Sequence, residues 1–117
     1  MKKIFISYTL RDSFINKDKL QSIKNKLLSI LNVQTYIDII DNHNLNSPQE
    51  EVIRQLTQAD AVWVINSPKI NESEWVATEL SCANKYFIPI YYIDVEIVNE
   101  ILNINDSKIY KIISNFL

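Results

Sequence analysis

Hydrophobic residues along the chain gather in short runs that alternate with amphipathic segments. Three runs are almost entirely apolar and rich in β-branched and aromatic residues, at residues 3–8, 61–66 and 87–93. Nearly continuous runs of this kind are typical of strands that are covered on both faces in a parallel sheet. A fourth run, residues 35–40, alternates more strongly and carries Asp38, which favours a strand at the edge of that sheet.

The segments between these runs have the spacing of amphipathic helices. In the first segment the apolar residues recur about every 3.6 positions, at Leu20, Ile23, Leu27, Ile30 and Leu31. The second segment opens with SPQE, where we expect Ser47 to cap the helix, Pro48 to take its first position and Glu50 to complete a capping box. For the third helix, either Asn71 or Ser73 is the expected cap.

After residue 93 the pattern predicts two further short helices and leaves a fifth strand open. The last helix has an apolar face made of Ile109, Ile112, Ile113 and Phe116. Pro89 cannot donate a hydrogen bond to a sheet, so its strand should start late or lie near an edge. Together the elements predict an α/β sandwich with a parallel sheet of four to five strands, formed by residues 1–117 as one domain.

Loops that follow the strands of an open parallel sheet form its ligand crevice. Three such loops are expected here, at residues 9–13, 41–47 and 67–73. If the strand order is 2-1-3-4, the first and third strands are neighbours where the order reverses. Tyr8, Arg11 and Asp12 would then face the helix that follows the third loop.

Glu79 on that helix is a misfit in the pattern. The apolar stripe of the helix consists of Val76, Leu80, Ala83 and Phe87. At 100° per residue Glu79 lies at the margin of this stripe, one turn after Trp75. Periodicity leaves two interpretations open: the side chain can extend to solvent from the rim of the helix, or it can serve a site in which desolvation works against its charge.

The other candidates also have plain structural interpretations. Trp75 can be an aromatic residue at the boundary of the core. Arg11 and Asp12 can form a surface ion pair of little energetic weight. Asp38 can be a turn former.

Composition removes several classes of function. The chain has no glycine, which excludes the P-loop and the glycine-rich dinucleotide fingerprint. One cysteine, Cys82, and one histidine, His43, allow neither an internal disulfide nor a Cys/His metal cluster. A net charge of -2 gives no footprint for nucleic acid, and no apolar run approaches the roughly 20 residues that span a bilayer. We therefore expect a cytoplasmic protein without nucleic-acid, membrane or metal partners.

Four segments carry a resemblance to a known family. They are KIFISYTLRD, TYIDIID, VWVINSPKINESEWVATEL and IPIYYI. In order and spacing they resemble the boxes of TIR (Toll/interleukin-1 receptor) domains over residues 1–95, and YKIISNFL resembles the closing helix of that fold. The resemblance implies a flavodoxin-like three-layer sandwich with strand order 2-1-3-4-5.

The resemblance also implies an activity. Many TIR domains cleave NAD at the bond between nicotinamide and ribose, giving ADP-ribose or a cyclic variant, whereas others only assemble with further TIR domains. The NAD-cleaving members carry a glutamate four residues after a tryptophan, and WVATE supplies this pair as Trp75 and Glu79. Glu79 is thus expected to be catalytic by stabilising an oxocarbenium-like ribose. Tyr8, Arg11, Asp38 and Trp75 are the expected substrate contacts, with NAD as substrate and no cofactor.

The resemblance extends to partners. Residues 40–51 correspond to the BB loop of the family but lack its glycine, and their proline is expected to start a helix. Because this loop mediates assembly in many members, we expect self-association or TIR–TIR assembly, together with a separate sensor or effector protein of bacterial antiviral immunity. Two alternatives stay open: a non-catalytic assembly module, and an enzyme similar to nucleoside deoxyribosyltransferases, which also act on an N-glycoside with a glutamate.

Overall fold

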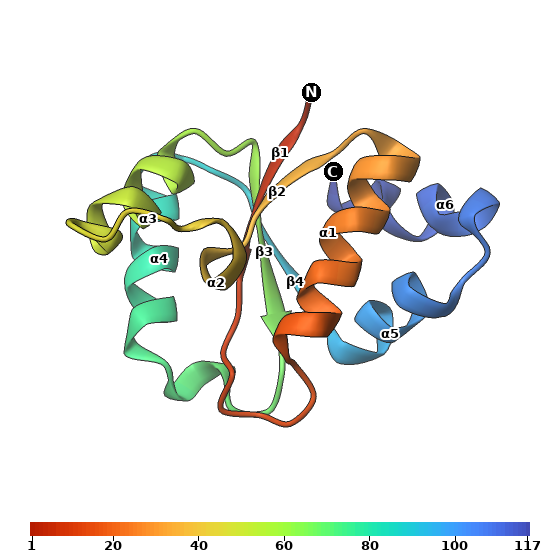
Figure 1. Cartoon of the computed structure of the whole chain (residues 1–117), viewed down its shortest axis with the longest axis horizontal. Helices are drawn as coiled ribbons and strands as arrows, with labels where there is room; N and C mark the ends of the chain where they lie inside the picture. Colours follow the sequence, from red (N-terminus) through yellow and green to blue (C-terminus); the bar gives the residue numbers. More distant parts are fainter.

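A four-stranded parallel sheet separates two layers of helices in the computed structural model, which describes residues 1–117 (Figure 1). Its strands are β1 (Lys3–Ser7), β2 (Gln34–Tyr36), β3 (Ala61–Asn66) and β4 (Ile90–Asp94). The spatial order is β2-β1-β3-β4, and every neighbouring pair is parallel. This is the α/β, flavodoxin-like arrangement expected from the sequence, with the order reversing between β1 and β3.

The helices divide between the two faces of the sheet (Figure 1). One face is covered by α3 (Pro48–Thr57) and α4 (Glu74–Lys85). The opposite face is covered by α1 (Lys17–Leu31), α5 (Val95–Asn103) and α6 (Ile109–Ile113). The remaining short helices are α2 (Asp38–Asp41) and the 3-10 turns η1 (Ile70–Glu72), η2 (Asp106–Lys108) and η3 (Ser114–Phe116). None of the helices is both long enough and apolar enough to cross a membrane.

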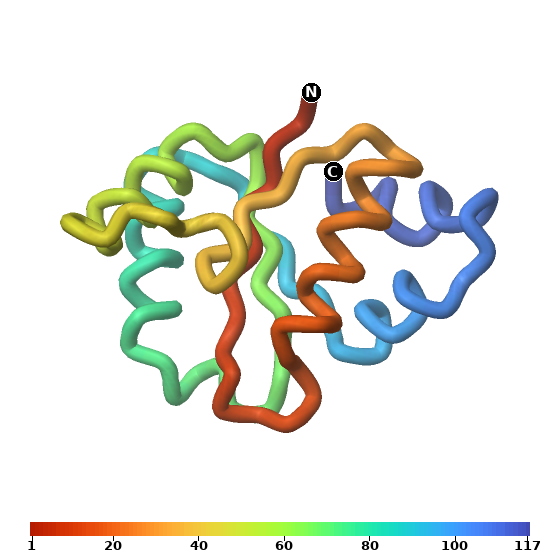
Figure 2. Tube along the Cα trace, viewed as in Figure 1, coloured from red at the N-terminus to blue at the C-terminus, as the bar shows by residue number.

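Each face of the sheet has its own hydrophobic core. Side chains alternate along a strand, so Ile4 and Ile6 of β1 pack on the side of α1 while Phe5 packs on the side of α3 and α4. The last turn of the chain closes the first core, because Trp63 Nε1 donates to the Phe116 carbonyl at 2.8 Å. The two ends of the chain lie near each other (Figure 2), and Lys2 Nζ donates to Leu117 O at 3.0 Å.

The second strand is shorter than the pattern of residues 35–40 indicates. It lies at the edge of the sheet, as expected, but ends at Tyr36, and the chain then turns into α2. Two side chains take the backbone amides that a longer strand would use: Asp41 Oδ2 accepts from Ile37 N–H at 2.8 Å, and the Tyr8 hydroxyl accepts from Ile39 N–H at 2.9 Å. The prediction of a strand through residue 40 is therefore wrong.

The predictions around the fourth strand are confirmed. β4 starts directly after Pro89 and forms the other edge of the sheet. After it the chain forms α5 and α6 without a fifth strand, so the four-stranded form of the prediction holds and the fifth strand implied by the family resemblance is absent. Ile109 and Ile113 of α6 are buried, and Ile112 and Phe116 pack against the same core.

Helix starts follow the sequence only in part. Ser73, one of the two expected caps, accepts a hydrogen bond from Val76 N–H at 3.2 Å. At α3, Pro48 takes the first helical position but Ser47 makes no side-chain cap bond. The Ser47 amide, which a capping-box glutamate would occupy, donates instead to Asn44 Oδ1 at 2.9 Å. The expected capping box is therefore absent.

Two helices end on non-glycine residues in the left-handed region. Asn32 closes α1 at φ 55°, and Phe87 follows α4 at φ 57°. The end of α4 is a Schellman motif, with Phe87 N–H donating to the Asn84 carbonyl and Ile88 N–H to the Ala83 carbonyl. This conformation turns Phe87 out of the apolar stripe expected for it and leaves it 93% exposed.

Replacing Phe87 by glycine should stabilise the protein. Glycine adopts positive φ without the steric cost borne by other residues, and the exposed ring contributes little packing. We expect Phe87→Gly to raise the free energy of unfolding by up to about 1 kcal/mol in urea titrations. Tyr86→Gly is the matched control, because Tyr86 has φ -98° and should lose stability. A Phe87→Gly protein less stable than wild type would contradict this account.

Candidate functional site

The loops after β1 and β3 meet at the carboxyl edge of the sheet, at the bottom of Figure 2. Two hydrogen bonds join them: Asp12 Oδ2 accepts from Lys69 N–H at 2.9 Å, and Arg11 Nη1 donates to the Glu72 carbonyl at 2.8 Å. Asp12 is buried and Arg11 exposed, so the alternative of a surface ion pair between them does not hold. The segments that lead into α4 are thereby held against the end of β1.

Glu79 is buried under this edge. Only 4% of the residue is exposed, and Ser7 Oγ donates to Glu79 Oε1 at 2.8 Å. The residues of α4 that face the sheet are Val76, Glu79 and Ala83, about one per turn, so Glu79 lies within the buried stripe. The interpretation in which its side chain extends to solvent is therefore wrong.

Burial changes the acidity of this carboxyl group. Loss of hydration raises the pKa of Glu79 to about 7, and the negative charge of Asp38 acts in the same direction. The hydrogen bond from Ser7 works against both by stabilising the ionised form. Near neutral pH the group therefore exists in both protonation states, which is the condition in which a carboxyl group can exchange a proton during a reaction.

A small hollow lies beside α4, between α2 and the start of α3. Its volume is about 110 Å³. It is lined by Asp38, Asn42, Pro48, Gln49, Val52 and Trp75. Two of the expected substrate contacts, Asp38 and Trp75, thus lie together. Pockets that enclose ligands usually measure about 300–1,000 Å³, so the hollow must widen before it can hold a molecule as large as a dinucleotide.

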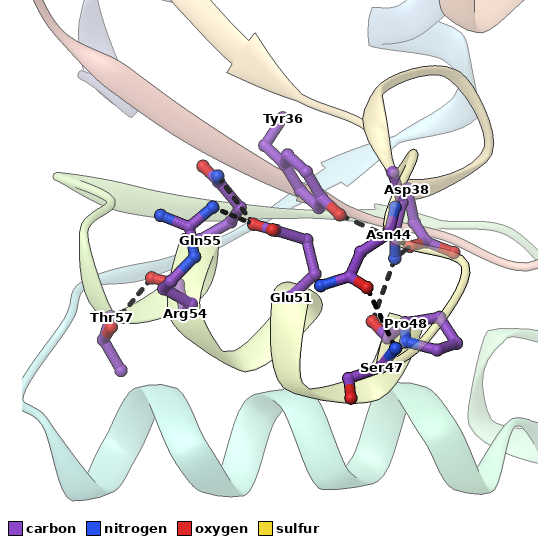
Figure 3. A network of polar contacts seen from close by, with 10 residues as sticks. Tyr36, Asp38, Asn44, Ser47, Pro48, Glu51, Arg54, Gln55 and Thr57 are labelled. Carbon is purple, nitrogen blue, oxygen red and sulfur yellow. Dashed lines mark hydrogen bonds and ion pairs between the residues drawn. The ribbon is translucent and has the colours of Figure 1, made fainter.

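Asn42 bridges the two sides of this hollow. Its Nδ2 donates to Asp38 Oδ1 at 2.8 Å and to the Pro48 carbonyl at 2.9 Å. Figure 3 shows the adjoining polar network, in which the Tyr36 hydroxyl points to Asp38 and Asn44 accepts from the amide of Ser47. We call residues 42–47 the closing loop, because the side chain of Asn42 at its start holds α2 to α3 across the hollow.

The other expected contacts lie around this centre in different ways. Tyr8 is half-buried and packs on the α1 side of the sheet, where its hydroxyl holds the amide of Ile39. Burial, together with the charges of Asp38 and Glu79, raises the pKa of Tyr8 to about 12. Arg11 remains at the surface, bonded to the Glu72 carbonyl. The structure thus brings Asp38 and Trp75 to one hollow. Tyr8 does not line this hollow but is bonded to the backbone of α2, and Arg11 stays exposed at the rim of the carboxyl edge.

Sequence reasoning missed Ser7, the direct partner of Glu79. The signal was available in the alternation of β1, where Ser7 follows Phe5 on the face that α3 and α4 cover. A polar side chain on the inner face of a buried central strand needs a hydrogen-bond partner. That partner could have been sought on the helix that packs over the end of the strand.

Comparison of the chain with models of protein families, with curated proteins and with solved structures finds no match. No group of three or more histidine, cysteine, aspartate or glutamate side chains is arranged to hold a metal ion.

Glu79 should make the stability of the protein depend on pH. Its pKa is about 7 in the folded chain and close to 4.5 when exposed, so the folded state binds the proton more tightly. Stability from this group is complete below pH 4.5 and is lost as pH rises through 7, by about 3 kcal/mol. Urea titrations from pH 4.5 to 8 should show this fall in wild type and its absence in Glu79→Gln.

Glu74→Gln is the matched control for that experiment, since Glu74 is an exposed carboxylate on the same helix. Its stability profile should follow that of wild type. If the free energy of unfolding varied with pH in the same way in Glu79→Gln and in Glu74→Gln, burial would not be what controls the ionisation of Glu79.

Asn42 should control the opening of the closing loop. Asn42→Asp removes both amide donors and places a second carboxylate beside Asp38. Each lost hydrogen bond is worth about 1 kcal/mol, so backbone amides of residues 42–51 should exchange with deuterium at least about tenfold faster. Mass spectrometry of that segment measures the rate. His43→Ala, an exposed neighbour in the same loop, should leave it unchanged; equal exchange in Asn42→Asp and wild type would exclude the bridge.

Proposed function

We propose that this protein cleaves the bond between nicotinamide and ribose in NAD, with Glu79 as the catalytic residue. The observation that carries the proposal is a buried carboxyl group with a raised pKa at the carboxyl edge of an open parallel sheet, where ligands of such sheets bind. The substrate is suggested by the spacing of Trp75 and Glu79, which is similar to that of TIR domains that cleave NAD.

The proposed reaction suits a carboxylate. The nicotinamide ring of NAD carries a positive charge on its nitrogen, so when the C1′–N bond breaks, the bonding electrons neutralise the ring. Nicotinamide then leaves without needing a proton from the protein. Positive charge develops on the ribose instead, and ionised Glu79 stabilises it, the more strongly because the site excludes water.

The second half of the reaction decides the product. Water adds to C1′ of the ribose and gives up a proton, which Glu79 can accept because its pKa lies near 7. The products are then nicotinamide, ADP-ribose and one proton. If a nitrogen of the adenine base adds to C1′ in place of water, the product is a cyclic ADP-ribose.

In this proposal Asp38 and Trp75 contact two different parts of the substrate. Trp75 offers an aromatic face to the nicotinamide ring, and Asp38 offers carboxylate oxygens to the ribose hydroxyls. Arg11 at the rim carries the positive charge that the diphosphate requires. Tyr8 acts indirectly, since it holds α2 and therefore Asp38 in place.

The substrate can enter only after the closing loop moves. The hollow of about 110 Å³ does not reach the size of a ligand pocket, and Glu79 does not line it. We infer that self-association or a separate sensor protein displaces the loop and starts the reaction. Such control would suit an antiviral function in bacteria, because the cell must keep its NAD until it is infected.

One observation favours a second candidate function. Leu45, at the tip of the closing loop, is 95% exposed and contacts no core. Loops of this kind often carry binding residues, and Leu45 is free to contact another protein, as a non-catalytic assembly module requires. In that case Leu45→Ser would abolish association while Glu79→Gln had no effect on it.

Nicotinamide release from NAD tests the enzymatic proposal. With concentrated protein, chromatography should detect release by wild type, and Glu79→Gln should reduce the rate at least about 100-fold because the transition-state charge loses its partner. Glu74→Gln on the same helix should match wild type. Equal rates in wild type and Glu79→Gln, at the level of the buffer blank, would refute an NAD-cleaving activity.

The rate should also follow the ionisation of Glu79. Only the carboxylate stabilises the positive ribose, so below pH 7 the rate should fall about tenfold per pH unit, and above it the rate should level off. The measurement is the pH profile of nicotinamide release at saturating NAD. A rate constant that does not vary between pH 5 and 8 would exclude ionised Glu79 as the acting form.

A further inference from the structure

The last residue of β1 carries a hydroxyl group that the core does not need. Ser7 is 1% exposed, and its Oγ donates to Glu79 Oε1 across 72 positions of the chain. A buried hydroxyl without a partner costs stability, and an aliphatic side chain would serve the packing of β1 equally well. We propose that Ser7 is a positioning residue, which holds the carboxyl group of Glu79 at the reactive edge and partners it in both protonation states.

A hydroxyl suits this task because it is both a donor and an acceptor. When Glu79 is ionised, Ser7 donates to it. When Glu79 is protonated, the same hydroxyl can accept a hydrogen bond from the carboxyl O–H or donate one to the carbonyl oxygen. An ammonium or guanidinium group would hold Glu79 permanently ionised, and an alanine would leave the buried carboxylate without a donor. Glu79 can therefore gain or lose a proton while its buried partner stays in place.

The surroundings of Glu79 make Ser7 its one stabilising contact. The charged group that acts on Glu79 from α2 is Asp38, which repels it. The titratable group directly after β1 is Tyr8, which stays neutral up to high pH. The nearest arginine of the edge, Arg11, is bonded to the Glu72 carbonyl, and no cation forms an ion pair with Glu79. Removing the hydroxyl should thus act chiefly on ionised Glu79.

A role of Ser7 in catalysis rests on the proposed function, whereas the hydrogen bond between Ser7 and Glu79 can be tested without substrate. The test is a double-mutant cycle of Ser7→Ala and Glu79→Gln, measured by urea unfolding from pH 5 to 9. We expect Ser7→Ala to destabilise the protein more at pH 9 than at pH 5, because the unpartnered carboxylate is then ionised. The titration midpoint of Glu79 in the folded protein, obtained by fitting these stability profiles, should rise by about one unit. In the Glu79→Gln background the cost of Ser7→Ala should not vary with pH.

Two further variants separate positioning from packing. Ser7→Thr keeps the hydroxyl and should restore the wild-type midpoint, even if its extra methyl group lowers stability at every pH. Thr9→Val removes another buried hydroxyl at the same edge, one that accepts from Arg11 N–H and not from Glu79, and should leave the midpoint unchanged. If Ser7→Ala has an equal effect at pH 5 and pH 9, Ser7 is a packing residue and the proposal is overturned.

A kinetic measurement distinguishes this proposal from the one on function. If the protein cleaves NAD, Ser7→Ala should shift the pH profile of nicotinamide release upward by the same unit, and Ser7→Thr should reverse the shift. An unshifted profile would overturn the positioning role in catalysis. If no variant releases nicotinamide, the proposed function fails, while the double-mutant cycle still decides whether Ser7 positions Glu79.

Discussion

The site depends on the burial of one carboxyl group. α4 turns Glu79 toward the sheet together with Val76 and Ala83, so the carboxyl group cannot reach water and must find its donor within the protein. The donor is Ser7, at the point where β1 ends and the strand order reverses. The bond pairs a carboxyl group that would otherwise be buried without a donor, on the helix face that Val76 and Ala83 already turn toward the sheet.

Burial has opposite consequences for chemistry and for access. Exclusion of water raises the pKa of Glu79 and strengthens its action on a nearby positive charge. The same close packing leaves little open space nearby, because the hollow beside Asp38 and Trp75 is small and Asn42 ties its two sides together. The proposed activity therefore requires the closing loop, on which Leu45 is exposed, to move.

Much of the fold could be predicted from local pattern, because nearly continuous apolar strands and 3.6-residue spacing report directly on burial. The proline before β4 even indicated where that strand begins and that it lies at an edge. The failures come from side-chain and backbone contacts that hydrophobic periodicity does not report. β2 ends early because Asp41 and the Tyr8 hydroxyl accept from the amides of Ile37 and Ile39. Phe87 leaves the apolar stripe of α4 because it takes the left-handed position after the helix, which glycine fills in most proteins and which this chain, without glycine, must give to another residue. Glu79 was found as a misfit, but its partner Ser7 lies 72 positions away and becomes visible only when β1 and α4 are packed together.

The central claim is that the carboxyl group of Glu79 is buried and titrates near neutral pH. A carbon-13 NMR titration of glutamate side-chain carboxyls in the wild-type protein, with Glu79 assigned by comparison with Glu79→Gln, tests it most directly. The account predicts a midpoint near 7 for Glu79. A midpoint near 4.5, the ordinary value of an exposed glutamate, would show that water reaches the group and would contradict the account.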